Sequence, residues 1–399
     1  MHPPLSRIAL FQPNLWKFYL FKFFMGLHFF GAILIPFFTE WGGLNFTQIF
    51  FLQAWFMFWI FALEVPTGTL ADRFGRKTSI VAGVFINIIA VLLYIYQPTF
   101  EVFLVAEFMW AMASSLISGA DEALLYDTLK TIGKEKTSKK TFSRVESMGL
   151  LGIGIASPVG SLLVAQFGFP SVYYATAGAL GIAALIALTY REPPAFEKVI
   201  QKDYFALLKG GLRYLRDHRI LRILAWDAIS IGTIAYFMIW LFQPLLQQVG
   251  VGIAYFGFVH AALIGVEILA LQAYPHVDKL LGNKRQLLFL TSIATGIGFL
   301  IAGVANDPVI AIFAILLAGG IGLSRKPILS SYMQKYIPSD QRATVGSAIN
   351  MFRTLAITIA NLIVGTLADW SISNTLLILG VTAIGLAYVS KVEEEHLID

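Results

Sequence analysis

The stretch Gly68-Thr69-Leu70-Ala71-Asp72-Arg73-Phe74-Gly75-Arg76-Lys77 is the most informative part of this chain. Its ten residues carry four charges and lie between two apolar segments, each long enough to form a helix. Charged residues and glycines between two such segments are typical of a short loop that connects membrane helices. The stretch therefore predicts a turn at this position in a membrane protein.

The composition of the whole chain supports a membrane protein. Hydrophobic residues make up 57% of its 399 residues and charged residues 13%, whereas about a quarter of the residues of soluble proteins are charged. The mean hydropathy is +0.72. A spanning helix needs about 20 mostly apolar residues, because lipid cannot satisfy backbone hydrogen bonds. We expect an all-α integral membrane protein with twelve transmembrane helices at residues 18–38, 47–69, 78–97, 102–129, 143–166, 170–190, 223–246, 252–274, 284–304, 308–333, 343–368 and 372–390.

The basic residues predict the orientation of these helices. The loops after odd-numbered helices contain no Lys or Arg, and the loops after even-numbered helices contain many. By the positive-inside rule both termini are cytoplasmic, in the inner or plasma membrane. The basic isoelectric point of about 9.2 is then a consequence of orientation, and we expect no nucleic-acid partner.

The chain also predicts two halves with a shared plan. A polar stretch, residues 191–222, contains apolar and basic residues at helical spacing, which indicates a basic amphipathic helix on the inner membrane surface. At a shift of about 203 residues, Gly119 aligns with Gly322 and Glu64 with Glu267. We expect two pseudo-symmetric six-helix bundles, at 1–190 and 223–399, joined by a linker at 191–222.

The form of the opening stretch, G-x-L-A-D-R-x-G-R-K, resembles the loop between the second and third helices of the major facilitator superfamily (MFS) of transporters. The resemblance implies a transporter that binds its substrate near the midplane, between the two halves. In this family the loop Asp, an acid of helix four and an Arg of helix eleven form an ion-pair cluster that holds the cytoplasmic side closed. The resemblance implies a cytoplasmic gate here of Gly68, Asp72, Arg73, Gly75, Arg76, Asp127 and Arg342.

The fifth helix resembles one branch of that family. Ser157-Pro158-Val159-Gly160-Ser161, after three earlier glycines, is similar to the G-x-x-x-G-P-x-x-G-G pattern of drug–proton antiporters. This resemblance favours export. Small residues also allow two helices to approach closely, which explains the pattern nearly as well. Glu107 stands about where those antiporters have an intramembrane arginine, so the resemblance is incomplete.

Charges inside membrane spans are costly and by default mark functional sites. On a continuous helix, Glu107 would share a face with Asp121 and Glu122 and line a central cavity. Glu122 aligns with Arg325 of the second half, which leaves two interpretations. Either Asp121 and Glu122 pair with Arg325 and Lys326 across the halves as a gate, or the two sets bind opposite ends of a bipolar solute. The predicted substrate-binding or coupling residues are Glu64, Glu107, Asp121, Glu122, Asp227, Trp240, His260, Glu267, Arg325, Lys326, Asn350 and Arg353.

Within this set we expect different tasks. Glu64 and Glu267 are the leading proton carriers, with His260 as a partner, because a carboxylate in a partly apolar site can exchange protons near ambient pH. Arg353, near mid-membrane, would attract an anionic group. Asp227 and Trp240 suit an organic molecule with cationic or aromatic character.

These features predict a secondary active transporter for a small organic solute, working by alternating access, coupled to protons and favouring export. A facilitator or symporter for an anionic or zwitterionic metabolite is the alternative of the same fold. A non-transporting membrane sensor or scaffold is the alternative of another class. Enzyme motifs are missing and the chain has no cysteine, so we expect no enzyme, metal site or cofactor other than a proton gradient. The expected partners are the lipid bilayer and the solute, and we expect a monomer.

Overall fold

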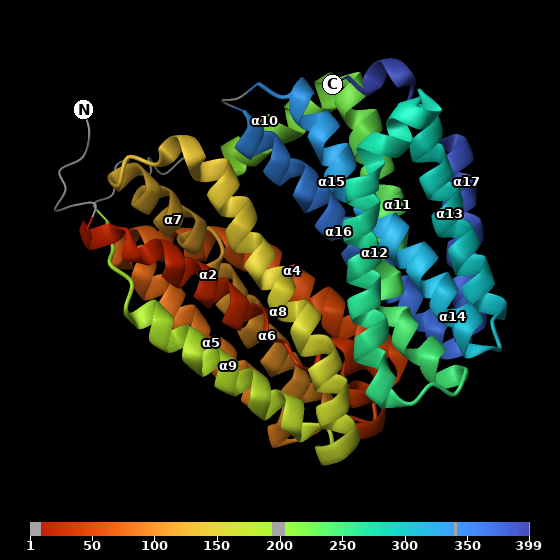
Figure 1. Cartoon of the computed structure of the whole chain (residues 1–399), viewed down its shortest axis with the longest axis horizontal. Helices are drawn as coiled ribbons and strands as arrows, with labels where there is room; N and C mark the ends of the chain where they lie inside the picture. Colours follow the sequence, from red (N-terminus) through yellow and green to blue (C-terminus); the bar gives the residue numbers. More distant parts are fainter. Residues whose placement is uncertain (1–8, 194–203, 339–340, 399) are drawn as a thin grey trace. The chain divides into compact units, whose positions relative to one another are not determined.

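The computed structural model describes residues 9–193, 204–338 and 341–398, which are helical with no strand among them. Within these residues twelve helical segments are long and apolar enough to cross a membrane (Figure 1). Each of the twelve overlaps one of the segments predicted from hydropathy. The prediction of an all-α protein with twelve membrane helices is therefore confirmed.

The chain divides into two compact units. The first holds the described residues of Met1–Leu44 and Trp55–Gln201, and the second those of Asn45–Ala54 and Lys202–Asp399. The first turns of helix α4 (Phe46–Phe74) therefore belong to the second unit. There the Asp369 carboxylate accepts hydrogen bonds from the backbone N–H groups of Phe46, at 2.7 Å, and Thr47, at 2.9 Å.

The first unit is formed by six spans. The opening stretch proves to be largely helical, because α4 continues to Phe74 and the chain turns only at Gly75, with φ +93°. The predicted turn therefore lies at Gly75, and the loop is shorter than the expected helix bounds of 47–69 and 78–97 imply. The other helices of this unit are α2 (Pro13–Gly26), α3 (Leu34–Pro36), α5 (Arg76–Tyr96), α6 (Phe100–Ile117), α7 (Ala120–Thr131), α8 (Ser138–Phe167) and α9 (Pro170–Leu188).

The fourth span is interrupted. Helix α6 ends at Ile117 and α7 begins at Ala120, with Gly119 at φ +75° between them. The prediction that Glu107 shares a face with Asp121 and Glu122 assumed a continuous helix and was wrong. The glycine redirects the chain, so that the two sets of acids lie in different surroundings.

The second unit contains the remaining helices. Its tenth span includes a π-helical segment, Leu316–Ile321, and Pro327 lies inside the regular helix that follows. A carboxylate caps one helix, because Glu394 accepts hydrogen bonds from the N–H groups of Lys284, at 3.1 Å, and Arg285, at 2.7 Å. The helices are α10 (Tyr204–Asp217), α11 (Arg219–Gln248), α12 (Phe256–Leu281), α13 (Lys284–Val304), α14 (Pro308–Ile315), α15 (Gly322–Met333), α16 (Arg342–Trp370) and α17 (Ile372–Val389).

The predicted amphipathic helix exists as α10, and it packs within the second unit. Gly211 lies so close to α16 that an added Cβ would come within 2.7 Å of the Thr344 carbonyl oxygen. The Tyr214 hydroxyl donates to the Tyr336 carbonyl at 2.8 Å. Part of the segment predicted as a separate linker is thus packed against α16.

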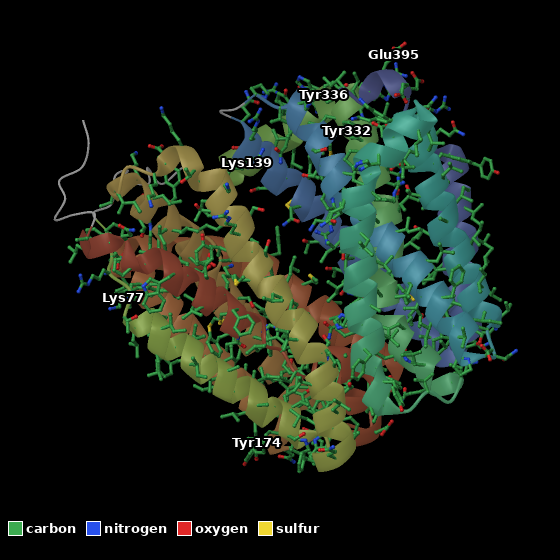
Figure 2. The ribbon with its side chains drawn as sticks, in the orientation of Figure 1. Lys77, Lys139, Tyr174, Tyr332, Tyr336 and Glu395 are labelled. Carbon is green, nitrogen blue, oxygen red and sulfur yellow. The ribbon has the colours of Figure 1, made fainter. Side chains whose placement is uncertain are left out.

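Lys77 and Lys139, two basic residues that the topology prediction places on one side of the membrane, lie at the same end of the first unit (Figure 2). Tyr174 lies at the opposite end of this unit. In the second unit, Tyr332, Tyr336 and Glu395 lie at one end. The carboxylate cap is repeated in the first unit, where Glu192 accepts from the Arg76 N–H at 2.6 Å. Negative charge at a helix N-terminus is stabilising. One helix in each unit, α5 and α13, is therefore stabilised by a glutamate at its N-terminus.

The glycines of the fifth span serve close packing. A Cβ on Gly160 would lie 1.7 Å from the Phe29 carbonyl oxygen, and one on Gly152 would lie 2.4 Å from that of Phe23. Both carbonyls belong to the first span, whose residues therefore approach α8 at backbone distance. The antiporter-like pattern has a structural role, as small residues between membrane helices usually do.

Gly160→Ala should lower the stability of the folded protein, because the added methyl group meets a backbone atom that cannot rotate away. Overpacking of this kind costs about 1–3 kcal/mol. Gly154→Ala, on the same helix with nothing within 4 Å of the added Cβ, is the matched control. Thermal unfolding of the purified protein in detergent measures the difference. Equal midpoints for the two variants would contradict the packing described here.

Candidate functional site

Arg76 organises the end of the first unit near the opening stretch. Its guanidinium pairs with the Asp127 carboxylate and donates to the Ala123 carbonyl at 3.0 Å. Both side chains of the pair are mostly buried, at 16% and 8% exposure. Buried charges need partners of this kind. Two of the predicted gate residues are therefore in contact.

The other predicted gate residues have different positions. Gly68 lies within α4, and the side chain of Asp72 lies outside the described residues. Arg73 is exposed and lies over the Phe74 ring, 5.4 Å from its centroid. Gly75 provides the turn before α5. Arg342, in the second unit, donates through Nε to the Ile337 carbonyl at 3.3 Å.

Asp121 is neutralised inside the first unit. The Lys22 ammonium lies 2.8 Å from the Asp121 carboxylate and 2.9 Å from that of Glu146. Asp121 is buried, at 4% exposure, while Glu122 is exposed. Asp121 was predicted to pair with a basic residue of the second half. The structure shows that Lys22, in the same unit as Asp121, is already its counter-charge.

Glu107 lies in an aromatic pocket of the first unit. It is only 5% exposed, the Tyr94 hydroxyl hydrogen-bonds to it, and Tyr173 is close enough for an electrostatic interaction. The Trp110 ring packs edge-on against His28, 5.3 Å away between centroids. His28 Nε2 and the Tyr173 hydroxyl are buried without a hydrogen-bond partner in the described residues. Such orphaned polar groups commonly bind water or a ligand.

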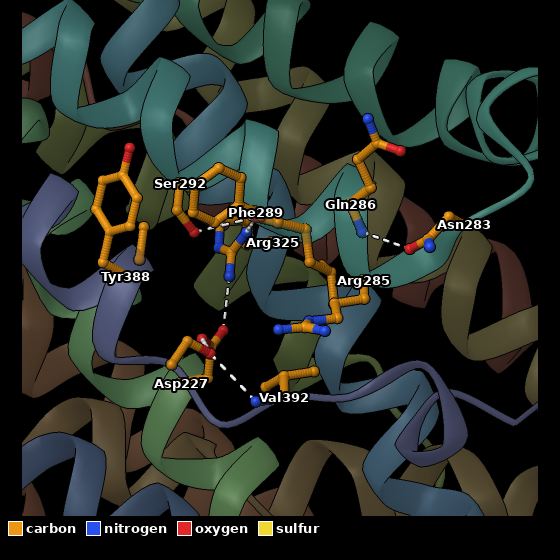
Figure 3. A pocket seen from close by; sticks show the side chains of 12 residues that line it. Asp227, Asn283, Arg285, Gln286, Phe289, Ser292, Arg325, Tyr388 and Val392 are labelled. Atoms are coloured by element: carbon orange, nitrogen blue, oxygen red, sulfur yellow. Dashed lines mark hydrogen bonds and ion pairs between the residues drawn. The ribbon is translucent and has the colours of Figure 1, made fainter.

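Arg325 and Asp227 form the most buried ion pair of the second unit (Figure 3). Arg325 Nη2 donates to the Asp227 carboxylate at 2.6 Å, and the Ser390 hydroxyl donates to the other oxygen at 2.7 Å. Arg325 is 2% exposed and Asp227 6%. Arg325 also donates to the Leu288 carbonyl and the Thr291 hydroxyl. Each charge therefore has its counter-charge inside this unit.

Lys326 and Arg353 have different surroundings. They line a cavity of about 280 Å³ together with Arg342, Asn350 and Ser330, all from α15 and α16. The two cations are close enough to repel each other. Neither forms an ion pair with a carboxylate within the part of the chain that the structure describes. The Glu267 carboxylate has a favourable electrostatic interaction with Lys326, but the two groups are too far apart to form an ion pair.

The remaining predicted residues lie elsewhere. His260 is buried and its ring stacks on Phe242, with centroids 5.6 Å apart. Trp240 is half-buried near Tyr236 and Phe50, and its indole N–H is without a partner in the described residues. The side chain of Glu64 lies outside the described residues.

Lys22, Glu146, Tyr94 and His28 were missed as site residues by sequence reasoning. The Lys22 side chain is only 23% exposed, and its ammonium contacts two carboxylates. Charge balance could have found it, because a buried acid such as Asp121, at 4% exposure, requires a cation. Nothing in the sequence spacing of Tyr94 indicates that its hydroxyl meets Glu107.

Comparison of the sequence with known proteins assigns the chain to a protein family. A model of the Major Facilitator Superfamily matches residues 18–361. The uncharacterized MFS-type transporter YxaM of Bacillus subtilis (strain 168) is 23% identical over 299 residues, or 71% of each chain. Multidrug resistance protein 1 of the same organism is 23% identical over 347 residues, or 86% of each chain.

A solved structure is similar in fold. The crystal structure of the nucleoside transporter NupG superposes with a TM-score of 0.78, covering 95% of this chain and 99% of its own, at 15% identity. At this identity the likeness shows the fold alone. The family match extends over most of the chain and through both units, and the twelve membrane helices agree with it. The chain therefore belongs to the Major Facilitator Superfamily of transporters.

Proposed function

We propose that this protein is a secondary active transporter for a small organic solute that carries an anionic group. The observation that carries the proposal is the cavity with Lys326 and Arg353. Two neighbouring cations in membrane spans repel each other and lose hydration. A bound anion would reduce the repulsion between the two cations and replace part of their lost hydration. Anion binding therefore explains why two cations lie together in this cavity.

The other groups of the cavity suit a polar organic molecule. Asn350, Ser330 and Gln334 can donate or accept hydrogen bonds, and Met333, Ile337 and Ile349 are apolar. Pockets for small ligands combine an apolar lining with a few placed polar groups. The volume of about 280 Å³ is near the lower end for such pockets, which favours a compact solute.

Arg325 has no part in this binding proposal. Arg325 is among the residues predicted to bind substrate, but its charge is compensated by Asp227. The proposal therefore keeps the anion-binding role for Lys326 and Arg353 alone.

We further propose that transport is coupled to protons through a buried carboxylate. Glu107 is the best placed among the described acids, because it is buried and hydrogen-bonded by a neutral tyrosine hydroxyl. Such a carboxylate, in a partly apolar site, can take up and release a proton within the span. Glu267, attracted by Lys326, and Glu64 are the further candidates.

Export is the proposed direction. The helix-five pattern resembles that of drug–proton antiporters, and the similar Multidrug resistance protein 1 covers most of the chain. A flux measurement in both directions tests this. It also separates transport from the alternative of a non-transporting sensor, which would bind the solute and show no flux.

Lys326→Gln and Arg353→Gln should each weaken binding of an organic anion by about tenfold or more, since a hydrogen bond to a charged group contributes about 1.5–3 kcal/mol. Thermal-shift titration with a panel of organic carboxylates, sulfonates and phosphate esters, and with quaternary ammonium ions, measures this. Lys335→Gln removes a charge just beyond α15, outside the cavity, and should bind anions normally. Stabilisation by cations alone, or anion binding that survives both substitutions, would refute the anion site.

Glu107→Gln should abolish proton-driven flux while leaving exchange of solute intact, because an amide cannot carry the proton. The assay uses proteoliposomes with an imposed pH gradient and the anion selected by the titration. Glu101→Gln, exposed at the start of the same helix, serves as control and should behave as wild type. Wild-type flux that does not change when the gradient is collapsed would contradict coupling.

A further inference from the structure

A second cavity of the second unit lies apart from the Lys326 and Arg353 cavity. Its volume is about 420 Å³, and its lining comes from the start of α13, the end of α17 and the chain beyond it, together with Asp227 and Arg325 (Figure 3). No residue lines both cavities. It is therefore a separate site, for which the transport proposal has no use.

The charges of this cavity are unequal. Two guanidinium groups, of Arg285 and Arg325, and one carboxylate, of Asp227, line it. Each oxygen of the carboxylate already accepts a hydrogen bond, one from Arg325 and the other from Ser390. Figure 3 shows the Arg285 guanidinium turned toward the inside of the cavity. Within the described residues no acid pairs with it.

Arg325 provides a second, independent indication of a ligand. Its side chain is 2% exposed, yet its Nε–H has no hydrogen-bond partner in the described residues. A buried donor without a partner costs about 1–3 kcal/mol, more for a charged group. An anion in the cavity could accept from this Nε–H and from the Arg285 guanidinium together.

The helix N-terminus at the cavity does not by itself attract the anion. Its first amides are already taken, because Glu394 accepts from Lys284 and Arg285, and the Asn283 side chain accepts from Gln286 at 2.7 Å. Recognition must come from the two guanidinium groups. Arginine forks match phosphate oxygens in a bidentate manner, which favours a phosphate over a simple halide.

The surroundings of the cavity suit a membrane interface. Tyr388 and Val389 at the end of α17 are 73% and 69% exposed, and Leu290 of α13 is 43% exposed. Such apolar surfaces on membrane helices face lipid, and a tyrosine near a span end is typical of the headgroup level. The basic loops predict that this end of the second unit is cytoplasmic. Basic pockets between helices on that side bind anionic headgroups.

We propose that the cavity between α13 and α17 binds a phosphate group, with Arg285 as its principal ligand and Arg325 Nε as a second donor. Both a phospholipid of the inner leaflet and a soluble phosphate carry this chemistry. A phospholipid would place its acyl chains along Val389 and Leu290.

Thermal unfolding of the full-length protein in phosphatidylcholine nanodiscs, with and without phosphatidylglycerol of the same acyl chains, tests the proposal. Phosphatidylglycerol should raise the midpoint of the wild type and of the control Lys279→Gln, which removes an exposed charge outside the cavity. Arg285→Gln should lose more than half of that rise, and Arg285→Lys should keep more of it than Arg285→Gln does. Ala387→Leu, which narrows the cavity without changing its charge, should lose the rise as well.

A titration with inorganic phosphate in phosphatidylcholine nanodiscs, read as the shift of the unfolding midpoint, distinguishes a soluble phosphate from a phospholipid headgroup as the ligand. An Arg285-dependent shift with phosphate alone supports the site and assigns it to a soluble phosphate. A shift only with phosphatidylglycerol assigns it to the lipid. The proposal is overturned if neither probe gives a shift that depends on Arg285, or if Ala387→Leu responds as the wild type does.

Discussion

The structure depends on one constraint: a charge buried in a membrane span needs a counter-charge within the same bundle. The second unit meets it with Asp227 and Arg325, which are almost fully buried and 2.6 Å apart. In the first unit, Lys22 neutralises Asp121. Because an uncompensated buried ion costs several kcal/mol, these pairs fix which helices can pack together and at what depth.

The same constraint separates structural charges from functional ones. Lys326 follows Arg325 directly in the sequence, yet it lines a cavity beside Arg353 and lacks an ion-pair partner in the described residues. Membrane proteins keep such costly charges where a ligand or a moving proton uses them. Glu107, which is buried and hydrogen-bonded by the Tyr94 hydroxyl, is the acid that we assign to proton movement.

The fold could be predicted from hydropathy, because every span must be apolar over about 20 residues whatever its neighbours are. The partners of the buried charges could not. The repeat aligned Glu122 with Arg325, but alignment gives equivalent positions and says nothing of which side chains meet. The turn at Gly119 was also hidden, since one glycine is compatible with a continuous helix. Arg76 and Asp127 could be placed in one predicted gate, because the loop motif is specific, and the structure brings these two members into contact.

The most direct measurement compares the free energy of unfolding of Arg325→Gln and Lys326→Gln in detergent micelles without ligand. Arg325→Gln should lose about 3–5 kcal/mol, because it leaves Asp227 buried without its cation. Lys326→Gln should lower the free energy of unfolding by less than about 1 kcal/mol, or should increase it. The reason is that the repulsion between Lys326 and Arg353 is removed. The double variant Asp227→Asn with Arg325→Gln should recover part of the loss. An equal loss in both single variants, or a larger one in Lys326→Gln, would contradict the account.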